Sequence, residues 1–371
     1  MTIATTFEIF FSCAPGLEPF LADEAREKGF QGVLPIAGGV TVNGGWPDIW
    51  RANLELRGTN RITVRIAQFR VLHLAQLDKR GRRVPWSDVL RRDVPFSVQV
   101  TCRTSRVYHS DAAAERITRA INEELGAPAH KDAPVTVMAR IENDLCTISV
   151  DTSGDLLHKR GYKESVNAAP MRETMAALFL RQCGYDGREP VIDPMCGSGT
   201  FVIEAAEIAA GLNPGRLRSF AFEHLATFHA PTWTAMRAPS SQPITPLRFI
   251  GSDRDESAVR MSQRNAERAG VAAIASFRHH KVNELKRPEG RPGLVIVNPP
   301  YGDRIGDKSK LSGLYRSMGE TLRAEFSGWR VGVITTERAL ARATGLPFLP
   351  TSAPVPHGGL RVTLYRTAKL P

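Results

Sequence analysis

A glycine-rich turn at residues 193–201 constrains the fold of this chain more than any other feature. It reads DPMCGSGTF and joins a short apolar strand, Val191-Ile192-Asp193, to a helix predicted over Thr200–Ala210. Glycines at a strand-to-helix turn let the backbone bend sharply and approach a ligand closely. A tight turn that binds nothing is the alternative, but nine residues of this composition favour a ligand-binding loop.

Strands and helices alternate through the rest of the second half of the chain. From about residue 160 the pattern predicts helices over Met171–Cys183 and Glu256–Ala269 and strands over Phe249–Asp253 and Leu294–Val297. Such alternation is typical of a parallel sheet covered by helices. The proline-rich stretch 211–247 is long for a loop, so we expect it either to be functional or to pack on the surface as an element of its own.

Three kinds of nucleotide-binding loop compete for the glycine-rich turn. A P-loop requires Gly-Lys-Ser/Thr, and no lysine follows Gly199. A dinucleotide-binding turn requires Gly or Ala three residues after its second glycine, where this chain has Val202. We therefore expect the turn to bind S-adenosylmethionine. The residues that would hold it are Asp193, Pro194, Met195, Cys196, Gly197, Ser198, Gly199 and Thr200.

The ribose of such a cofactor calls for a carboxylate at the end of the next strand. Asp253 ends the strand Phe249–Asp253 and supplies one. Asp253 also precedes the helix Glu256–Ala269, so capping that helix is the alternative role, and the two roles are compatible. The separation of Asp253 from Gly199 is longer than the roughly 20 residues usual for a dinucleotide site, and the proline-rich stretch accounts for the difference.

A second motif, Asn298-Pro299-Pro300-Tyr301, follows the apolar strand Leu294–Val297. Its prolines fix the backbone, so that the Asn298 side-chain carbonyl and the Pro299 backbone carbonyl can accept the two N–H bonds of a planar exocyclic amine. Tyr301 would stack on the base that carries this amine. The expected chemistry is in-line methyl displacement, promoted by positioning and electrostatics without a metal. A proline-terminated turn explains the prolines but not the asparagine and the tyrosine.

The first 150 residues follow a different pattern. They predict one small α+β unit over residues 1–60 and a second over residues 61–155, which ends in a polar turn cluster at residues 151–155. The α/β region then covers residues 160–371. In the first two units the expected strands are Phe7–Cys13, Val40–Val42, Arg61–Val71, Phe96–Cys102, Val135–Ile141 and Cys146–Val150, and the expected helices are Leu17–Lys28 and Ala112–Leu125.

Positive charge is concentrated in one part of the chain. The 371 residues carry a formal net charge of +11 at pH 7. Residues 51–100 hold 11 basic and 4 acidic side chains, a local excess of +7. A polyanion such as nucleic acid is the partner that this excess favours, and a solvated basic surface is the alternative. The basic residues are Arg51, Arg57, Arg61, Arg65, Arg70, Lys79, Arg80, Arg82, Arg83, Arg91 and Arg92.

Several classes of protein are disfavoured. Hydrophobic residues make up 42% of the chain, which is ordinary for a globular protein, and no apolar stretch approaches the roughly 18 residues of a membrane span. The first eleven residues contain Glu8 and no basic segment, unlike a secretory signal. The five cysteines form no C-x-x-C pair and the histidines show no metal-ligand spacing. We therefore expect a cytoplasmic protein without a disulfide framework or a metal.

The motifs resemble those of a known family. DPMCGSGTFVIEAA and NPPYGDR resemble class I S-adenosylmethionine-dependent methyltransferases of the (D/N)PPY type. LHKRGYKE, APMRETMAAL and DPMCGSGT, in this order, resemble ribosomal RNA guanine-N2 methyltransferases of the RlmL type. The first 150 residues are similar to that family's ferredoxin-like segment and THUMP RNA-binding domain. The resemblance implies a class I, Rossmann-like methyltransferase domain over residues 160–371, preceded by α+β ferredoxin-like and THUMP domains. It also implies N2-methylation of a guanosine in 23S ribosomal RNA.

The chain departs from that family at two places. Where relatives carry an acidic residue near the adenine amine, this chain has Lys281, with Asn283 two residues later. His357-Gly358 stands where relatives tend to have Asn-Gly. The chain also ends without the second methyltransferase module of larger relatives, so we expect one activity.

Other functions remain open on the sequence alone. A transfer RNA guanine-N2 methyltransferase, or an adenine-N6 methyltransferase acting on DNA or RNA, would use the same Asn-Pro-Pro-Tyr motif. The basic N-terminal half and the lack of a recognisable groove-reading element favour RNA over double-stranded DNA. A non-catalytic RNA-binding protein would be expected to have lost the glycine-rich turn or Asn298, and the chain has both.

Overall fold

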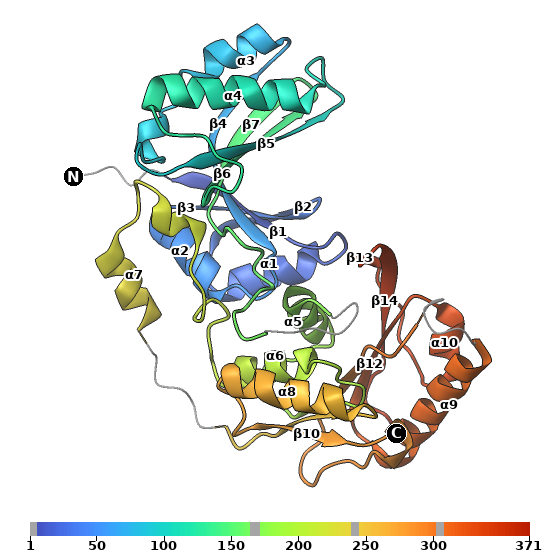
Figure 1. Cartoon of the computed structure of the whole chain (residues 1–371). Helices are drawn as coiled ribbons and strands as arrows, with labels where there is room; N and C mark the ends of the chain where they lie inside the picture. Colours follow the sequence, from blue (N-terminus) through green and yellow to red (C-terminus); the bar gives the residue numbers. More distant parts are fainter. Residues whose placement is uncertain (1–5, 164–170, 239–244, 302–307) are drawn as a thin grey trace. The chain divides into compact units, whose positions relative to one another are not determined.

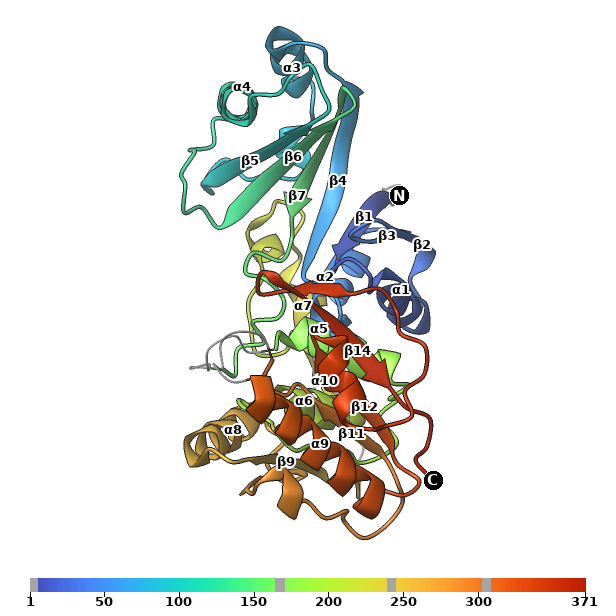
Figure 2. The same ribbon diagram turned by 90° about the vertical axis from the view of Figure 1, so that its right-hand side faces the viewer.

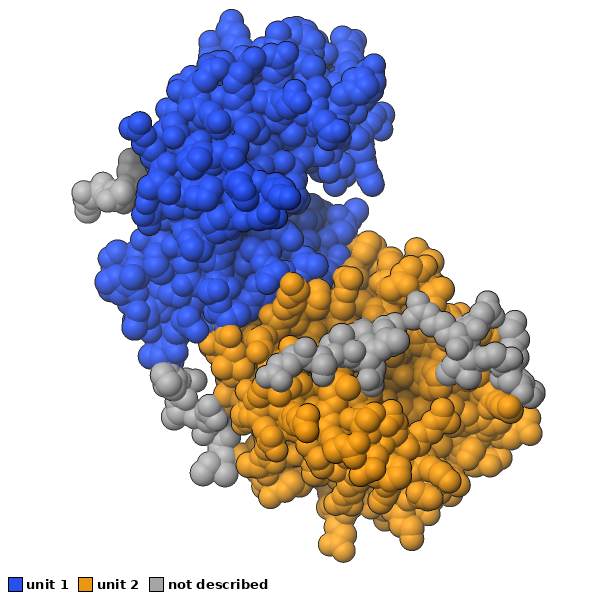
Figure 3. Space-filling model, in the orientation of Figure 1, with its two compact units in different colours: residues 1–13, 22–157, 218–238 blue, residues 14–21, 158–217, 239–371 orange. Residues whose placement is uncertain are grey.

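The chain forms two compact units, which Figure 3 shows in different colours. Unit 1 comprises residues 1–13, 22–157 and 218–238, and unit 2 comprises residues 14–21, 158–217 and 239–371. The computed structural model describes residues 6–163, 171–238, 245–301 and 308–371 (Figure 1). No helix within these ranges is both long and apolar enough to cross a membrane.

Unit 1 is built on one seven-stranded sheet with the strand order β2-β3-β1-β4-β7-β6-β5. β4 joins the two halves of this sheet, because it pairs antiparallel with β1 on one side and with β7 on the other. The boundary expected near residue 60 thus falls at the start of β4. The strands are β1 (Phe7–Ser12), β2 (Gln31–Ile36), β3 (Gly39–Gly44), β4 (Arg61–Arg70), β5 (Phe96–Arg103), β6 (Val135–Glu142) and β7 (Leu145–Asp151).

Four α-helices described in this half of the sequence connect those strands: α1 (Glu18–Glu27), α2 (Trp46–Glu55), α3 (Leu74–Gly81) and α4 (Ser110–Leu125). α3 and α4 lie side by side on one face of the part of the sheet formed by β4 to β7 (Figures 1 and 2). α4 buries Ala113, Ile117, Ala120 and Ile121, the spacing of one face of an amphipathic helix. That periodicity is why the sequence predicts α4.

Sequence periodicity did not predict β2, α2 or α3. β2 contains Gly32 and Pro35, which disguise its alternation. α2 has a proline in its first turn. Proline is favourable at that position of a helix, but in the sequence it suggests a turn. α3 buries only Leu77 and Gly81, so its apolar period is too short to recognise. β2 and α3 thus bury few residues, whereas α2 was missed although it buries Ile49, Trp50, Ala52 and Leu54.

Part of the proline-rich stretch belongs to unit 1. Residues 218–238 form the short 3-10 helix η2 (Ala221–His224) and the helix α7 (Ala230–Arg237). Phe222 is fully buried there, with its ring centroid 6.1 Å from that of Trp50 and 4.9 Å from that of Trp233. Residues 218–238 therefore pack as an element anchored in unit 1 by buried aromatic side chains, whereas residues 211–217 belong to unit 2.

Unit 2 contains a second seven-stranded sheet, with the order β10-β9-β8-β11-β12-β14-β13. The first five strands in this order are parallel, and β14 is antiparallel to β12. The chain runs outward from β8 in one direction through β9 and β10, and in the other through β11 and β12. The strands are β8 (Val191–Asp193), β9 (Phe249–Asp253), β10 (Ala275–His279), β11 (Leu294–Val297), β12 (Arg330–Thr335), β13 (Val355–His357) and β14 (Leu360–Arg366).

The helices of unit 2 are α5 (Glu173–Gln182), α6 (Thr200–Ala209), α8 (Glu256–Arg268), α9 (Lys308–Glu325) and α10 (Arg338–Ala343). α6 is apolar over most of its surface, and its first eight residues are buried. α9 contributes Tyr315, Met318 and Leu322 to the core against β11 and β12, and Phe326, which follows the helix, joins them. The strand–helix alternation expected from about residue 160 is confirmed.

Candidate functional site

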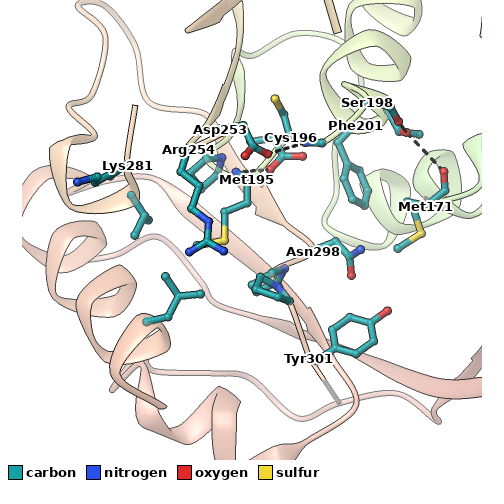
Figure 4. Close-up of a pocket in the computed structure, with 18 of the residues that line it drawn as sticks. Met171, Met195, Cys196, Ser198, Phe201, Asp253, Arg254, Lys281, Asn298 and Tyr301 are labelled. Atoms are coloured by element: carbon teal, nitrogen blue, oxygen red, sulfur yellow. Dashed lines mark hydrogen bonds between the residues drawn. The ribbon is translucent and has the colours of Figure 1, made fainter. Parts of the chain in front are cut away.

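The two sequence motifs meet at one edge of the unit 2 sheet. β8 and β11 are neighbouring parallel strands, and their carboxyl ends carry the glycine-rich turn and Asn298 respectively. The strand order reverses between them, which is where open parallel sheets place their ligand site. A cavity of about 820 Å³ opens there, and both motifs line it. Figure 4 shows Asn298 and Tyr301 projecting into the same cavity as Met195 and Ser198.

Hydrogen bonds within the glycine-rich turn fix its conformation. The Asp193 carboxylate accepts the Met195 N–H at 3.0 Å, and the Gly199 N–H donates to the Cys196 carbonyl at 2.7 Å. Gly197 and Gly199 have φ values of +53° and +82°, a region that residues with a Cβ rarely occupy. A Cβ on Gly197 would meet no described atom within 4 Å. The turn therefore leaves room for a ligand on the Gly197 side.

The carboxylate of Asp253 lies against this turn from the end of β9. One oxygen accepts the Gly197 N–H at 3.0 Å and the other accepts the Asp255 N–H at 3.0 Å. The N-cap of α8 is Asp255, whose side chain accepts the Ser257 N–H at 2.8 Å. Asp253 is therefore not the helix cap, and its half-buried carboxylate faces the cavity.

Two buried residues of α8 hold the turn from behind, and sequence reasoning did not find them. Ser262 donates to the Gly197 carbonyl at 2.8 Å, and Asn265 donates to the Ser198 carbonyl at 3.0 Å. Both side chains are completely buried. Because these two carbonyls are bonded to α8, the turn has a fixed conformation before any ligand binds. The only signal in the sequence was two polar residues on the apolar face of a predicted helix.

Burial shifts the acid–base behaviour of the turn. Asp193 is buried, and burial raises the pKa of its carboxyl to about 8, with the nearby charge of Asp253 adding to the rise and the Met195 N–H opposing it. Burial also raises the pKa of the Cys196 thiol well above its usual value. A thiol in that state is a poor nucleophile. Cys196 thus contributes shape to the turn.

The asparagine of the second motif has an unsatisfied buried acceptor. The Oδ1 atom of Asn298 is buried and has no hydrogen-bond partner among the described residues. Buried acceptors are almost always paired in proteins, so this one is suited to a ligand donor. Behind the motif, the fully buried Tyr315 of α9 donates from its hydroxyl to the Pro300 carbonyl at 3.3 Å. That bond fixes the direction of the turn that follows Asn298.

The remaining sequence candidates line the same cavity. Lys281 is exposed at its rim and Asn283 lies two residues later, on the 3-10 helix η3 (Val282–Glu284). His357 lines it from β13 and is buried. Arg254 and Met171, which the sequence did not single out, line it as well. No group of three or more His, Cys, Asp or Glu side chains in the described ranges is arranged to hold a metal ion.

Comparisons with known proteins agree with this geometry. Residues 160–349 match the family model described as RMKL-like, methyltransferase domain, and residues 8–63 match the RlmL ferredoxin-like domain. Curated relatives named ribosomal RNA large subunit methyltransferase K/L include one from Syntrophotalea carbinolica and one from Allochromatium vinosum. Each is 34% identical over 91% of this chain. This chain covers 50% and 49% of those two relatives, so it spans about half their length.

Two solved structures resemble the whole chain. One, titled as a predicted N6-adenine-specific DNA methylase from Listeria monocytogenes, is 28% identical with a TM-score of 0.88, and the match covers 98% of this chain and 97% of that one. Another, SMU.472, a putative methyltransferase complexed with SAH, is 25% identical with a TM-score of 0.85, and the match covers 99% of each chain. Together with the matched family model, these likenesses identify the chain as a member of the family of RMKL-like methyltransferase domains.

Proposed function

We propose that the protein is an S-adenosylmethionine-dependent methyltransferase that modifies the exocyclic N2 amine of a guanosine in large-subunit (23S) ribosomal RNA. One observation carries the proposal. The glycine-rich turn with its carboxylates and the unsatisfied Oδ1 of Asn298 line a single cavity. A donor of methyl groups and an acceptor amine therefore fit into one space.

The first half of the cavity fits the cofactor. The open side of Gly197 leaves room for it, and the Asp253 carboxylate has lone pairs free for ribose hydroxyls. Asp193 would pair with its ammonium group, and residues 194–200 would surround its methionine end. S-adenosylmethionine, when bound, supplies an electrophilic methyl group on a sulfonium. The structure that was solved with SAH is similar to this chain over nearly its whole length, which supports this assignment.

The second half of the cavity fits the target amine. Asn298 Oδ1 and the Pro299 carbonyl would each accept one N–H of the amine, which directs its lone pair toward the methyl group. Tyr301 would stack on the base, and Pro300 is held in place by Tyr315. Rate enhancement would come from alignment of the two reactants in a site that excludes water.

The choice of ribosomal RNA rests on the relatives and on unit 1. The curated relatives are named for large-subunit ribosomal RNA. In unit 1, part of the local positive charge is neutralised internally, as in the ion pairs of Arg61 with Asp151 and Arg65 with Glu8. Arg70, Lys79, Arg83 and Arg92 are exposed. Exposed cations of this kind bind RNA phosphates.

The domain assignment and location belong to the same proposal. We assign a ferredoxin-like segment to residues 1–60, a THUMP RNA-binding domain to residues 61–155 and the methyltransferase domain to residues 160–371. The protein would act in the cytoplasm. An adenine-N6 methyltransferase is the second candidate, since Asn298 would hold that amine equally well and the Listeria monocytogenes structure carries such a title.

Nucleoside mass spectrometry tests the product. Large-subunit ribosomal RNA from a deletion strain is expected to lose one N2-methylguanosine, and a plasmid-borne copy is expected to restore it. The target guanine must leave its stack to reach the cavity, so RNA from early assembly states should be the better substrate in vitro. Loss of the nucleoside from transfer RNA alone, or loss of N6-methyladenosine instead, would contradict the substrate assignment.

Cofactor affinity should depend on pH through Asp193. With a pKa of about 8 in the free protein, this carboxyl is protonated at neutral pH and must lose its proton to pair with a cation. Affinity should therefore rise with pH until about pH 8. The ratio of wild-type to Asp193→Asn affinity should increase about 50-fold between pH 6 and pH 8, the change in the deprotonated fraction of a group with a pKa of about 8. Calorimetry at each pH measures this ratio, in which the ligand's own titration cancels, and a constant ratio would refute the role of Asp193.

A further inference from the structure

A short segment before α5 carries two buried ion pairs next to the glycine-rich turn. Arg160 pairs with Glu204 of α6 at 3.2 Å, with side chains 2% and 0% exposed. Lys163 pairs with Glu173 of α5 at 2.6 Å, with side chains 11% and 5% exposed. Desolvation offsets most of the attraction in such pairs, so they add little net stability. Glu204 lies inside α6 and Glu173 begins α5.

Lys163 makes a second contact, and this contact reaches the cavity. Its ammonium donates to the hydroxyl of Thr200 at 2.7 Å. Thr200 is the first residue of α6 and lines the cavity, where it is 4% exposed. A buried cation thus contacts the hydroxyl of a residue that lines the proposed cofactor site.

The direction of that hydrogen bond determines what Thr200 can do. An ammonium group has no acceptor, so Lys163 must donate and the Thr200 oxygen must accept. The hydroxyl hydrogen of Thr200 is then left to donate elsewhere. In the part of the chain that the structure describes, the acceptors in its reach are the Met171 carbonyl and the Ser198 hydroxyl, both at 3.4 Å. The bond that Thr200 donates to the Met171 carbonyl is long for a hydroxyl donor, which prefers 2.7–2.8 Å, so a ligand acceptor at a shorter distance would replace it.

We propose that Lys163 is a positioning residue that turns the Thr200 hydroxyl toward the carboxylate of the cofactor's amino-acid end. This inference rests on the proposed function. The charges of the site match that end of the ligand, because Asp193 would take the ammonium group and the Lys163–Thr200 pair the carboxylate. The peptide N–H groups in the first turn of α6 lack intrahelical partners and would favour the same anion.

Two ligands that differ only at the amino-acid end test the role of Lys163 in the full chain. S-adenosylhomocysteine has both the ammonium and the carboxylate, whereas 5′-methylthioadenosine has neither. In the variant Lys163→Met/Glu173→Gln no buried charge is left unpaired. Its affinity for S-adenosylhomocysteine should fall at least about tenfold, as expected for a lost hydrogen bond with a charged group. Its affinity for 5′-methylthioadenosine should stay within about twofold.

One further variant completes the calorimetric experiment. Thr200→Val removes only the hydroxyl and should show the same selective loss. A parallel loss of both ligands in Lys163→Met/Glu173→Gln would make Lys163 a purely structural residue and overturn the proposal, as would unchanged binding of S-adenosylhomocysteine. Wild-type protein that binds neither ligand would instead refute the proposed function.

Discussion

Replacing Asn298 with alanine should lower kcat for RNA methylation by about 100-fold or more, the usual cost of losing one group that stabilises developing charge. The reason is that the buried Oδ1 of Asn298 is proposed to hold the target amine, while the cofactor is held by other residues. Cofactor affinity should therefore stay within about twofold of wild type. Single-turnover methylation assays and calorimetry measure the two quantities separately.

Asn283→Ala is the matched control for this substitution. Asn283 is also an asparagine that lines the cavity, but it lies on η3 after β10 and away from the second motif. Its replacement should leave kcat within a few-fold of wild type. If Asn298→Ala retained wild-type turnover, or lost turnover and cofactor affinity together, Asn298 would not be part of an amine clamp.

Replacing Phe222 with alanine should destabilise unit 1 by about 3–5 kcal/mol, as expected when a fully buried aromatic side chain is truncated. Phe222 is completely buried and its ring contacts those of Trp50, Phe220 and Trp233. Its backbone also bonds to unit 1, since the Phe222 N–H donates to the Thr152 carbonyl at 3.0 Å. Urea unfolding followed by tryptophan fluorescence should show an earlier transition, because Trp50 and Trp233 report on this cluster.

Tyr108→Ala is the control for aromatic loss in the same unit, because that side chain is 69% exposed. It should change the unfolding midpoint little. Equal shifts in the two variants would mean that residues 218–238 do not contribute to the core of unit 1.

The secondary structure was predictable where apolar residues repeat with a regular period. α4, with buried Ala113, Ile117 and Ile121, and the strand β6, whose buried residues alternate, are examples. Prediction failed for β2 and α3, whose few buried residues give no period to recognise. α9 was not predicted either, although it has 18 residues and buries Tyr315, Met318 and Leu322, so burial alone does not make an element recognisable in the sequence.

The chemistry of the candidate site was visible in the sequence because both motifs are contiguous. Residues 193–200 and 298–301 each occupy one turn at the end of one strand, and the parallel sheet brings such ends to the same edge. The residue types alone suggested a carboxylate for ribose and a carbonyl for an amine. The separate role of capping α8 could not be assigned from sequence, and the structure gives it to Asp255.

By itself the sequence determined the parallel-sheet class of the second half and the two motifs at its strand ends, because both depend on local backbone preferences. Only the tertiary structure decided which distant side chains support those motifs. Ser262 and Asn265 reach the turn from α8, and Lys163 reaches Thr200 from a segment 37 residues earlier. Tertiary structure likewise assigned residues 218–238 to unit 1. Such contacts depend on how elements far apart in the chain pack together, and no spacing within a single segment encodes them.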